Sequence, residues 1–422
     1  MSKLRNNLSL ISLNFMTWGA AIFLLALPFL PFFSITLGSI GTSQGVLLAF
    51  VFLWLVYSIN NRRVGFEFDN TNVAFIAIAF LSFVVSTVVR PETTPFILGI
   101  KNNILPIIAL LVFQLPFNKK HLLIKNIQWI VIIPGLIVAL LAILQSTIIP
   151  PDFLETIGYK TTDLSINTID PRQTVDGSLK IYRAFSTLGG PNQLGAYLIL
   201  PFSFVLAYFL KRKKWWALGL SLPILAAILL SFSRSAWLGT IAALIAVVIL
   251  LANKKQRIYI AIASFFITIL AGAVVLVVAS QNQAFQNVVM HGRYFENRIE
   301  GSDQQRLASL ATGLDKVMAK PFGSGLGSAG PASHRSAEPV ITENWYLQIA
   351  LEIGIIGLVL YFIAFSSLLI DFYRRIDEPL AVGLYAATVG ILVANLFLHT
   401  WADSTISIAM FSLYGIFKGK RL

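Results

Sequence analysis

Residues 345–369 read WYLQIALEIGIIGLVLYFIAFSSLL, a run of apolar residues that contains one charged side chain, Glu352. A helix needs about 20 such residues to cross the roughly 30 Å of hydrocarbon in a bilayer. Comparable runs recur along the chain, which has 56% hydrophobic residues, 12% charged residues and a mean hydropathy of +0.77. The sequence therefore predicts an all-α, polytopic integral membrane protein that forms a single membrane domain over residues 1–422.

The apolar runs predict about twelve transmembrane helices. They are expected at residues 15–33, 42–59, 72–89, 97–115, 127–149, 188–210, 215–232, 236–252, 258–280, 345–369, 379–399 and 404–417. Clusters of Lys and Arg, such as residues 211–214 and 374–375, fall in alternate connections between these spans. Because positive residues concentrate in cytoplasmic loops, both termini are expected in the cytoplasm. The net charge of +13 follows from this topology and gives no support to nucleic-acid binding.

Two connections on the opposite, extracytoplasmic side are long, at residues 150–187 and 281–344, whereas every cytoplasmic connection is short. We therefore expect the function to face outward. The second long loop contains an amphipathic pattern at Leu307, Leu310, Leu314, Val317 and Met318. A helix with this pattern is expected to lie along the membrane interface or to cap the bundle. The outward loops contain no Asp-x-Asp pair, no cysteine and no histidine cluster, so we expect neither a metal nor another cofactor.

Two arginines, Arg183 and Arg234, lie on the expected outer side, at positions that suit the binding of an anion. Arg183 precedes Gly189-Gly190-Pro191-Asn192, a break that exposes backbone N–H groups near a helix start and favours anion binding. The same arginine also suits contact with lipid phosphate beside an ordinary helix. Arg234 lies in the very short turn Ser231-Phe-Ser-Arg-Ser235, where it points either to headgroups or into the protein.

Two glutamates mark the span at 345–369. Glu343 stands at its outer start, where a carboxylate is favoured by the helix N-terminus and serves as a cap, as an arginine partner or as a base. Glu352 lies nine residues further on, about 13 Å deeper, and must be protonated or paired there. The nearby run Pro321-Phe-Gly-Ser-Gly-Leu-Gly327 imitates a dinucleotide-binding fingerprint, but no strand precedes it. We interpret it as a flexible or tight outward loop.

Taken in order, these pieces resemble the O-antigen ligase and polymerase-like superfamily of membrane glycosyltransferases. The matching pieces span about residues 180–375. They are Arg183…Gly190-Pro191-Asn192, Ser233-Arg-Ser-Ala-Trp237, the Arg306 helix with Pro321…Gly323-x-Gly325, and Glu343-Asn344-x-Tyr346-Leu347…Glu352-x-Gly354-x-x-Gly357. Each piece alone is a weak signal, and their shared order and sidedness make the resemblance specific.

The resemblance implies a GT-C-like, metal-independent enzyme that inverts the anomeric carbon. It implies transfer of an oligo- or polysaccharide from undecaprenyl diphosphate to an acceptor hydroxyl, on a lipid or a glycan, at the outer face of the bacterial plasma membrane. By matching positions, Arg183, Arg234 and Arg306 would grip the diphosphate. Polar residues of the same motifs, Asn192, Asn344 and Tyr346, are expected to bind substrate.

One position departs from the family. Ligases commonly carry His before the Asn at the start of the late span, and here that position is Glu343. A carboxylate can act as the general base on the acceptor hydroxyl, so Glu343 is our first choice, with His334 and His399 as substitutes. The departure leaves ligase and polymerase both open. A transporter or flippase of a lipid-linked or anionic substrate and a purely structural membrane protein remain as alternatives of other classes.

Overall fold

The computed structural model describes residues 17–33, 41–61, 66, 68–114, 127–149, 171–173, 180–253, 255–264 and 302–419. Among these residues, six helices are long and apolar enough to cross a membrane. They are α3 (Asn70–Val89), α4 (Thr93–Val112), α6 (Ile127–Thr147), α8 (Pro191–Arg212), α10 (Arg234–Leu251) and α14 (Trp345–Tyr373). Four shorter apolar segments are Thr17–Pro31, Thr42–Val56 within α2 (Thr42–Asn61), α9 (Trp215–Leu230) and α15 (Pro379–Ala394). The protein is therefore a multi-pass helical membrane protein.

The other described elements are short or lie at the ends of the bundle. They are η1 (Leu27–Phe33), β1 (Pro171–Gln173), β2 (Lys180–Tyr182), α13 (Ser302–Ala319), η3 (Gly330–Arg335), η4 (Thr400–Ala402) and α16 (Ser404–Gly419). β1 and β2 pair antiparallel, with Pro171 opposite Tyr182. The expected all-α class is confirmed for the described residues, and the two short strands form a local hairpin inside the expected loop at 150–187. Its cause is the polar, turn-rich sequence there, which has no helical period.

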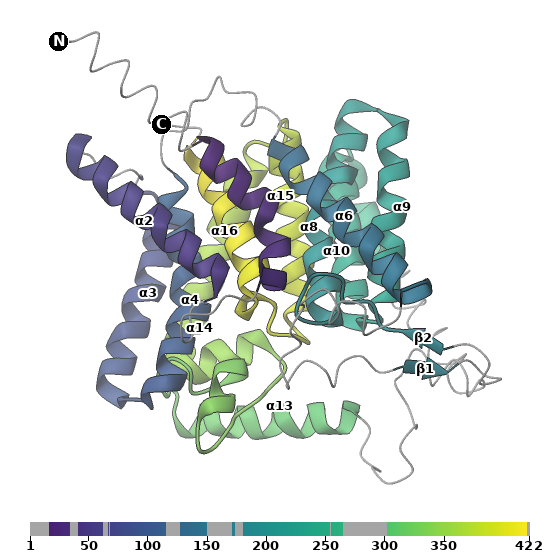
Figure 1. Cartoon of the computed structure of the whole chain (residues 1–422). Helices are drawn as coiled ribbons and strands as arrows, with labels where there is room; N and C mark the ends of the chain where they lie inside the picture. The colour runs from purple at the N-terminus through teal and green to yellow at the C-terminus, as the bar shows by residue number, and fades with distance from the viewer. Residues whose placement is uncertain are drawn as a thin grey trace.

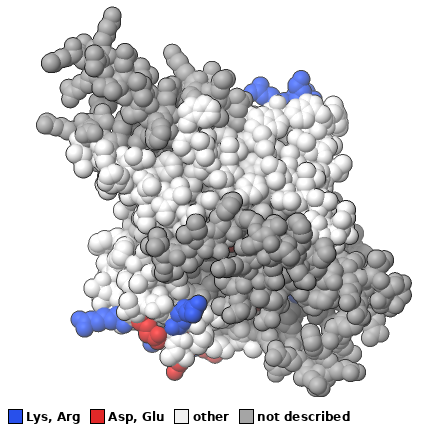
Figure 2. Space-filling model, viewed as in Figure 1, with Lys and Arg blue, Asp and Glu red and all other residues white. Residues whose placement is uncertain are grey.

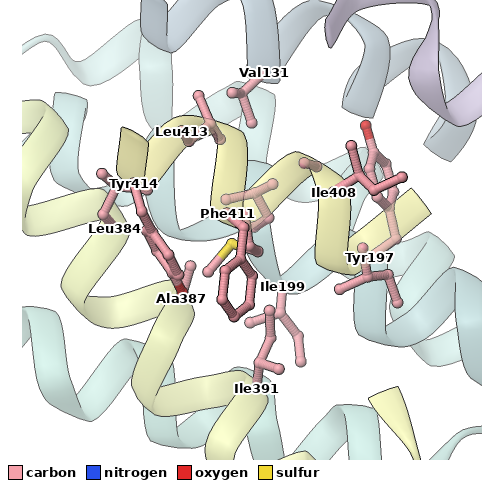
Figure 3. Packing of buried hydrophobic residues seen from close by; sticks show 14 of the residues in the cluster. Val131, Tyr197, Ile199, Leu384, Ala387, Ile391, Ile408, Phe411, Leu413 and Tyr414 are labelled. Atoms are coloured by element: carbon pink, nitrogen blue, oxygen red, sulfur yellow. The ribbon is translucent and has the colours of Figure 1, made fainter. Parts of the chain in front are cut away.

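The central helix of the bundle is α8, which packs against α6, α9, α10 and α15, while α3 packs against α14 and α4 against α16 (Figure 1). Small residues allow α10 and α15 to approach closely. A Cβ on Gly239 would lie 2.6 Å from the carbonyl oxygen of Gly390, and the reverse holds equally. Apolar side chains of α8, α15 and α16 interlock nearby, with Ile199, Ile391 and Phe411 at the contact (Figure 3).

The ends of the bundle differ as the loop charges predict. The α8–α9 turn, which carries Lys211 to Lys214, lies at the end opposite to α13 and the β hairpin (Figure 1). Basic side chains are visible at that first end, and mixed charges at the other (Figure 2). At the first end, Lys211 lies 3.8 Å from Asp377. Part of the expected span at 258–280 and of both long loops falls outside the described residues, and so does the side chain of Arg306.

The amphipathic helix predicted in the second loop is confirmed as α13. Its contact face differs from the predicted stripe, because Leu310, Gly313 and Val317 face the start of α14, where Leu347 packs against them. Three other apolar residues of the stripe are exposed, namely Leu307, Leu314 and Met318. Their placement in the membrane interface stays a prediction.

The glycine run before α14 is a tight loop built against a break in that helix. Gly354, inside α14, has a φ of +76°, and a Cβ there would lie 2.6 Å from the carbonyl oxygen of Pro321. The loop supplies the hydrogen bonds that the break removes. Ser324 N donates to Leu351 O at 2.7 Å, Gly325 N to Glu352 O at 2.9 Å, and Ile355 N to Pro321 O at 2.9 Å. The motif residues at 321–327 and at 354 therefore meet in space and satisfy one another.

Candidate functional site

The segment that carries Arg183 is bound to the turn that carries Arg234. Ala184 N donates to Leu230 O at 2.9 Å. The Arg183 Nε donates to Ser231 O at 3.0 Å, and its second terminal nitrogen lies 3.5 Å from Phe232 O. The two arginine motifs, about 50 residues apart in the chain, thus form one unit at one end of the bundle.

The same segment is fixed on its other side by α6. The side-chain oxygen of Gln145 accepts hydrogen bonds from Phe185 N at 3.0 Å and Ser186 N at 2.7 Å. These residues are buried, whereas Arg183 is half-buried. The Arg183 guanidinium is therefore held by a rigid support between α6 and the turn before α10, a condition for precise anion recognition.

Arg183 reaches the start of α8 through Asn192. Its terminal nitrogen donates to Asn192 Oδ1 at 3.2 Å. α8 begins at Pro191, and its N-cap residue, Gly190, supplies no side-chain hydrogen bond to the first turn. The positive end of the helix dipole favours an anion at this place, next to a guanidinium.

Asn192 also lines a pocket with a volume of about 310 Å³. The pocket lies between the start of α8, the loop before α14 and the connection between α15 and α16. Its lining residues are Asn192, Gln193, Ala196, Pro331, His334, Ile341, Glu343, Leu398, His399, Thr400, Ala402, Asp403 and Ile406. The fold thus gathers four of the residues singled out from the sequence, Asn192, His334, Glu343 and His399.

Glu343 has an unusual backbone at this pocket. Its φ is +46°, in the left-handed region that residues other than glycine and asparagine rarely adopt. Its side chain is half-buried. Five described residues other than glycine share a positive φ, and three of them lie in the segments of this site, namely Ser186, Phe232 and Glu343. Strained backbone that gathers in this way is typical of functional sites.

His399 and Asp403 lie in the connection between α15 and α16. The Nε2 atom of His399 is buried and has no hydrogen-bond partner among the described residues. Burial, and then the charge of His334, lower the pKa of His399 to about 4. Burial raises the pKa of Asp403, although the backbone N–H groups of Ile406 and Thr405 and the charge of Lys101 oppose the shift. Both effects keep charge low on this wall of the pocket.

Two comparisons with known proteins bear on this arrangement. Residues 219–362 match the family model described as O-antigen ligase. The chain is also 27% identical to an O-antigen polymerase of Salmonella muenchen over 333 residues, which are 75% of this chain and 78% of that protein. The chain is therefore similar to proteins of the O-antigen ligase and polymerase-like superfamily.

Other residues of the superfamily motifs have structural partners in this chain. Asn344 is the N-cap of α14, where its Oδ1 accepts a bond from Leu347 N and its Nδ2 donates to Leu396 O, both at 2.9 Å. The Tyr346 hydroxyl donates to Leu392 O at 2.5 Å. These contacts place the start of α14, and their expected role in substrate binding stays a prediction. Arg234 is half-buried at the first position of α10.

Glu352 is enclosed and lies away from the pocket. Its side chain is 0% exposed. Its Oε2 accepts a hydrogen bond from Asn103 Nδ2 at 2.9 Å, and its Oε1 accepts bonds from Gly327 N at 3.1 Å and Gln348 Nε2 at 3.2 Å. All three donors are neutral, and no described residue forms an ion pair with Glu352, so the expectation of a protonated or paired carboxylate stays a prediction.

Asp403 is a member of the site that its sequence alone does not reveal. Its Oδ1 accepts hydrogen bonds from Thr405 N at 2.8 Å and Ile406 N at 3.2 Å, the pattern of a residue that caps α16. The signal was present in Asp403-Ser404-Thr405, a cap before an apolar run, but nothing local links it to Glu343. Within the described residues, no group of three or more His, Asp or Glu side chains is arranged to hold a metal ion.

Proposed function

We propose that this protein is a glycosyltransferase that moves an oligo- or polysaccharide from undecaprenyl diphosphate to an acceptor hydroxyl at the outer face of the bacterial plasma membrane, without a metal and with inversion of the anomeric carbon. The observation that carries the proposal is the bond from Arg183 to Asn192. It joins a supported guanidinium at a helix N-terminus to the pocket that Glu343 lines. An anion site and a carboxylate thus adjoin one cavity.

At the donor side, the leaving group is a lipid diphosphate whose negative charge grows as the bond from the anomeric carbon to oxygen breaks. Fixed guanidinium groups stabilise such charge through planar, bidentate hydrogen bonds. We assign this role to Arg183 first, because its contacts hold it against the start of α8. Arg234 follows from the neighbouring turn, and Arg306 from its place in α13.

At the acceptor side, Glu343 takes the proton of the attacking hydroxyl. The hydroxyl oxygen forms its bond to the anomeric carbon on the face opposite to the diphosphate, which leaves with the electron pair of the broken bond. Attack from the opposite face inverts the anomeric carbon. Glu343 suits the role by position, since it is half-buried and lines the pocket together with His334 and His399. His399 is the second choice of base, because its Nε2 has no described partner.

The acceptor decides between ligase and polymerase. The matching family model is described as O-antigen ligase, whereas the relative from Salmonella muenchen is named a polymerase. Glu343 in place of the histidine common in ligases keeps the second possibility open. A lipid-linked repeat unit given alone should yield longer lipid-linked chains with a polymerase, and a ligase should need a separate lipid acceptor.

The proposal is tested with the purified full chain, a glycan on undecaprenyl diphosphate and an acceptor, with and without EDTA. We expect a new glycosidic bond of inverted configuration and equal rates in both conditions. If chelation stops transfer and Mg²⁺ or Mn²⁺ restores it, the arginines are not the only charge stabilisers. If the donor crosses the bilayer of a vesicle and no glycosidic bond forms, the protein is a flippase.

A further inference from the structure

A second pocket opens at the same end of the bundle and has a volume of about 620 Å³. Its walls are the α3–α4 turn, the last turn of α13 and the segments on either side of η3. The lining residues are Val89, Arg90, Pro91, Glu92, Pro95, Lys316, Ala319, Lys320, Ser324, Gly327, Ser328, Ser336, Ala337, Glu338, Val340 and Leu351. The family match and the arginine motifs assign no role to this pocket.

Three of the lining side chains are cations, Arg90, Lys316 and Lys320, and none of them forms an ion pair with another described residue. Of the two lining carboxylates, Glu92 is engaged. It accepts hydrogen bonds from Ser336 Oγ at 3.1 Å and Ala337 N at 3.3 Å, which tie the loop after η3 to the α3–α4 turn. Figure 2 shows basic side chains beside acidic ones at this lower end.

The chemistry of the walls suits a charged carbohydrate. Cations without ionic partners bind a carboxylate or a phosphate group, and the remaining walls offer hydroxyl and carboxylate oxygens to sugar hydroxyls through Ser324, Ser336 and Glu338. The volume lies within the range of pockets that hold small ligands. The three cations outnumber the two lining carboxylates, Glu92 and Glu338, so the pocket favours an anionic ligand over a neutral one.

The second pocket shares a wall with the first. Pro331 and His334 of η3 line the pocket of Glu343, while Ser336 and Val340, just beyond η3, line the second one. Ser333 holds this wall in shape, since its Oγ donates to Gly330 O at 2.7 Å and accepts from Val340 N at 3.0 Å. A glycan seated in the second pocket therefore lies next to the proposed site of transfer.

We infer that the second pocket binds an anionic segment of the acceptor glycan, one that carries a carboxylate or a phosphate group. The identity of the ligand as the acceptor rests on the proposed function, whereas the preference for an anionic saccharide rests on the pocket alone. The headgroup of an anionic phospholipid offers the same phosphate chemistry, so the test must separate the two sources.

The test uses the full chain in nanodiscs of phosphatidylcholine. The probes are an oligosaccharide that contains hexuronic acid and the same oligosaccharide with its carboxyl groups reduced to alcohols. We expect the acidic probe to bind, the Lys316→Gln/Lys320→Gln variant to raise its Kd at least tenfold, and the reduced probe to bind at least tenfold more weakly to the wild type. Arg335→Gln is the matched control, because Arg335 is exposed on the same side and lines neither pocket.

Two outcomes overturn the inference. In the first, the lysine variant binds the acidic probe as the wild type does. In the second, phosphatidylglycerol in the nanodiscs abolishes binding of the probe in the wild type, which makes the pocket a headgroup site. Donor binding is measured on the same proteins with the undecaprenyl-diphosphate glycan. Arg183→Ala should weaken donor binding and leave binding of the acidic probe unchanged, so that failure of the donor site and failure of this pocket are seen separately.

Discussion

Glu343 and Glu352 are two carboxylates nine residues apart, one just before α14 and one inside it, and the fold gives them opposite environments. Glu343 lines a pocket on a left-handed backbone. Glu352 is fully enclosed and accepts three hydrogen bonds from α4, from α14 itself and from the glycine loop. Two carboxylates of one sequence motif can therefore have different roles, and the sequence alone does not say which of them is placed to take a proton. An enclosed carboxylate with hydrogen bonds on both oxygens holds helices together, and a carboxylate at a cavity is able to take a proton.

The different roles assigned to Glu343 and Glu352 are tested most directly when each carboxylate is exchanged for its amide. Glu343→Gln keeps the size of the side chain and cannot accept a proton, so we expect turnover to fall by about 10²–10⁴ while donor binding persists. Glu352→Gln retains an oxygen that accepts hydrogen bonds, and its turnover should stay within about tenfold of the wild type. Transfer rate and donor binding are measured on both proteins.

Two results would contradict that assignment. Normal turnover in Glu343→Gln would make Glu343 a structural residue and turn the search for a base to His399 and His334. A larger loss of turnover in Glu352→Gln than in Glu343→Gln, with equal amounts of folded protein, would give the enclosed carboxylate the chemical role. A third variant, Glu343→His, restores the residue common in ligases and should retain partial activity.

The next effect concerns the anion site on the other side of the pocket. Arg183→Ala removes the donor to Asn192, and we expect transfer to fall by about 10²–10³, as with other donors that stabilise developing charge. Arg183→Lys should restore little of the transfer activity, because the ammonium is a point charge and lacks the two parallel N–H donors of the planar guanidinium. Arg212→Ala, an exposed arginine at the opposite end of α8, is the matched control. Near-normal transfer in Arg183→Ala would reject the proposed role in diphosphate binding.

The sequence predicted the helices well, because apolar length decides a membrane span. The predicted start of α14 at Trp345 is confirmed, and the ends of the other described spans differ by a few residues. It also singled out Arg183, Asn192 and Glu343. The sequence did not predict the contacts that join these residues. The hydrogen bonds from Arg183 to Ser231 and to Asn192 depend on how α8 packs against α9 and α10.

The glycine loop teaches the same lesson from the other side. Its composition predicted a flexible or tight loop, and only the break at Gly354 explains why it must be tight. Likewise, Asp403 has the local signature of a helix cap and becomes a member of the site only through the packing of the connection between α15 and α16. Local pattern predicts elements, whereas a site formed between elements far apart in sequence requires the fold.

A smaller effect tests the enclosure of Glu352. Gly327 has a φ of +80°, and a Cβ there would lie within van der Waals overlap of Pro95 O, besides disturbing the N–H that binds Glu352. Gly327→Ala should therefore lower the free energy of unfolding by about 2–4 kcal/mol. Gly219→Ala is the control, because it lies within α9 with open space around it, and it should be neutral or slightly stabilising. Equal stability of both variants in denaturant titrations would mean that the loop does not hold Glu352 in place.

The smallest effect comes from His399, which shares the pocket with Glu343. Its pKa of about 4 in the folded protein lies below the ordinary 6.5, so between these values the unfolded chain binds more protons than the folded one. The free energy of unfolding should therefore fall as pH drops from about 6.5 to 4.5, by about 1–2 kcal/mol after allowance for partial exposure. Asp403, with a raised pKa, works in the opposite direction and is present in both proteins compared. In His399→Gln, which keeps His334 and Lys101, the melting temperature should fall less over this pH range than in the wild type.

If the melting temperatures of the wild type and of His399→Gln fall in parallel, His399 is not held neutral by burial. A histidine with its ordinary pKa at this pocket would be the stronger base near neutral pH, and the case for Glu343 over His399 would then rest on the amide exchange alone.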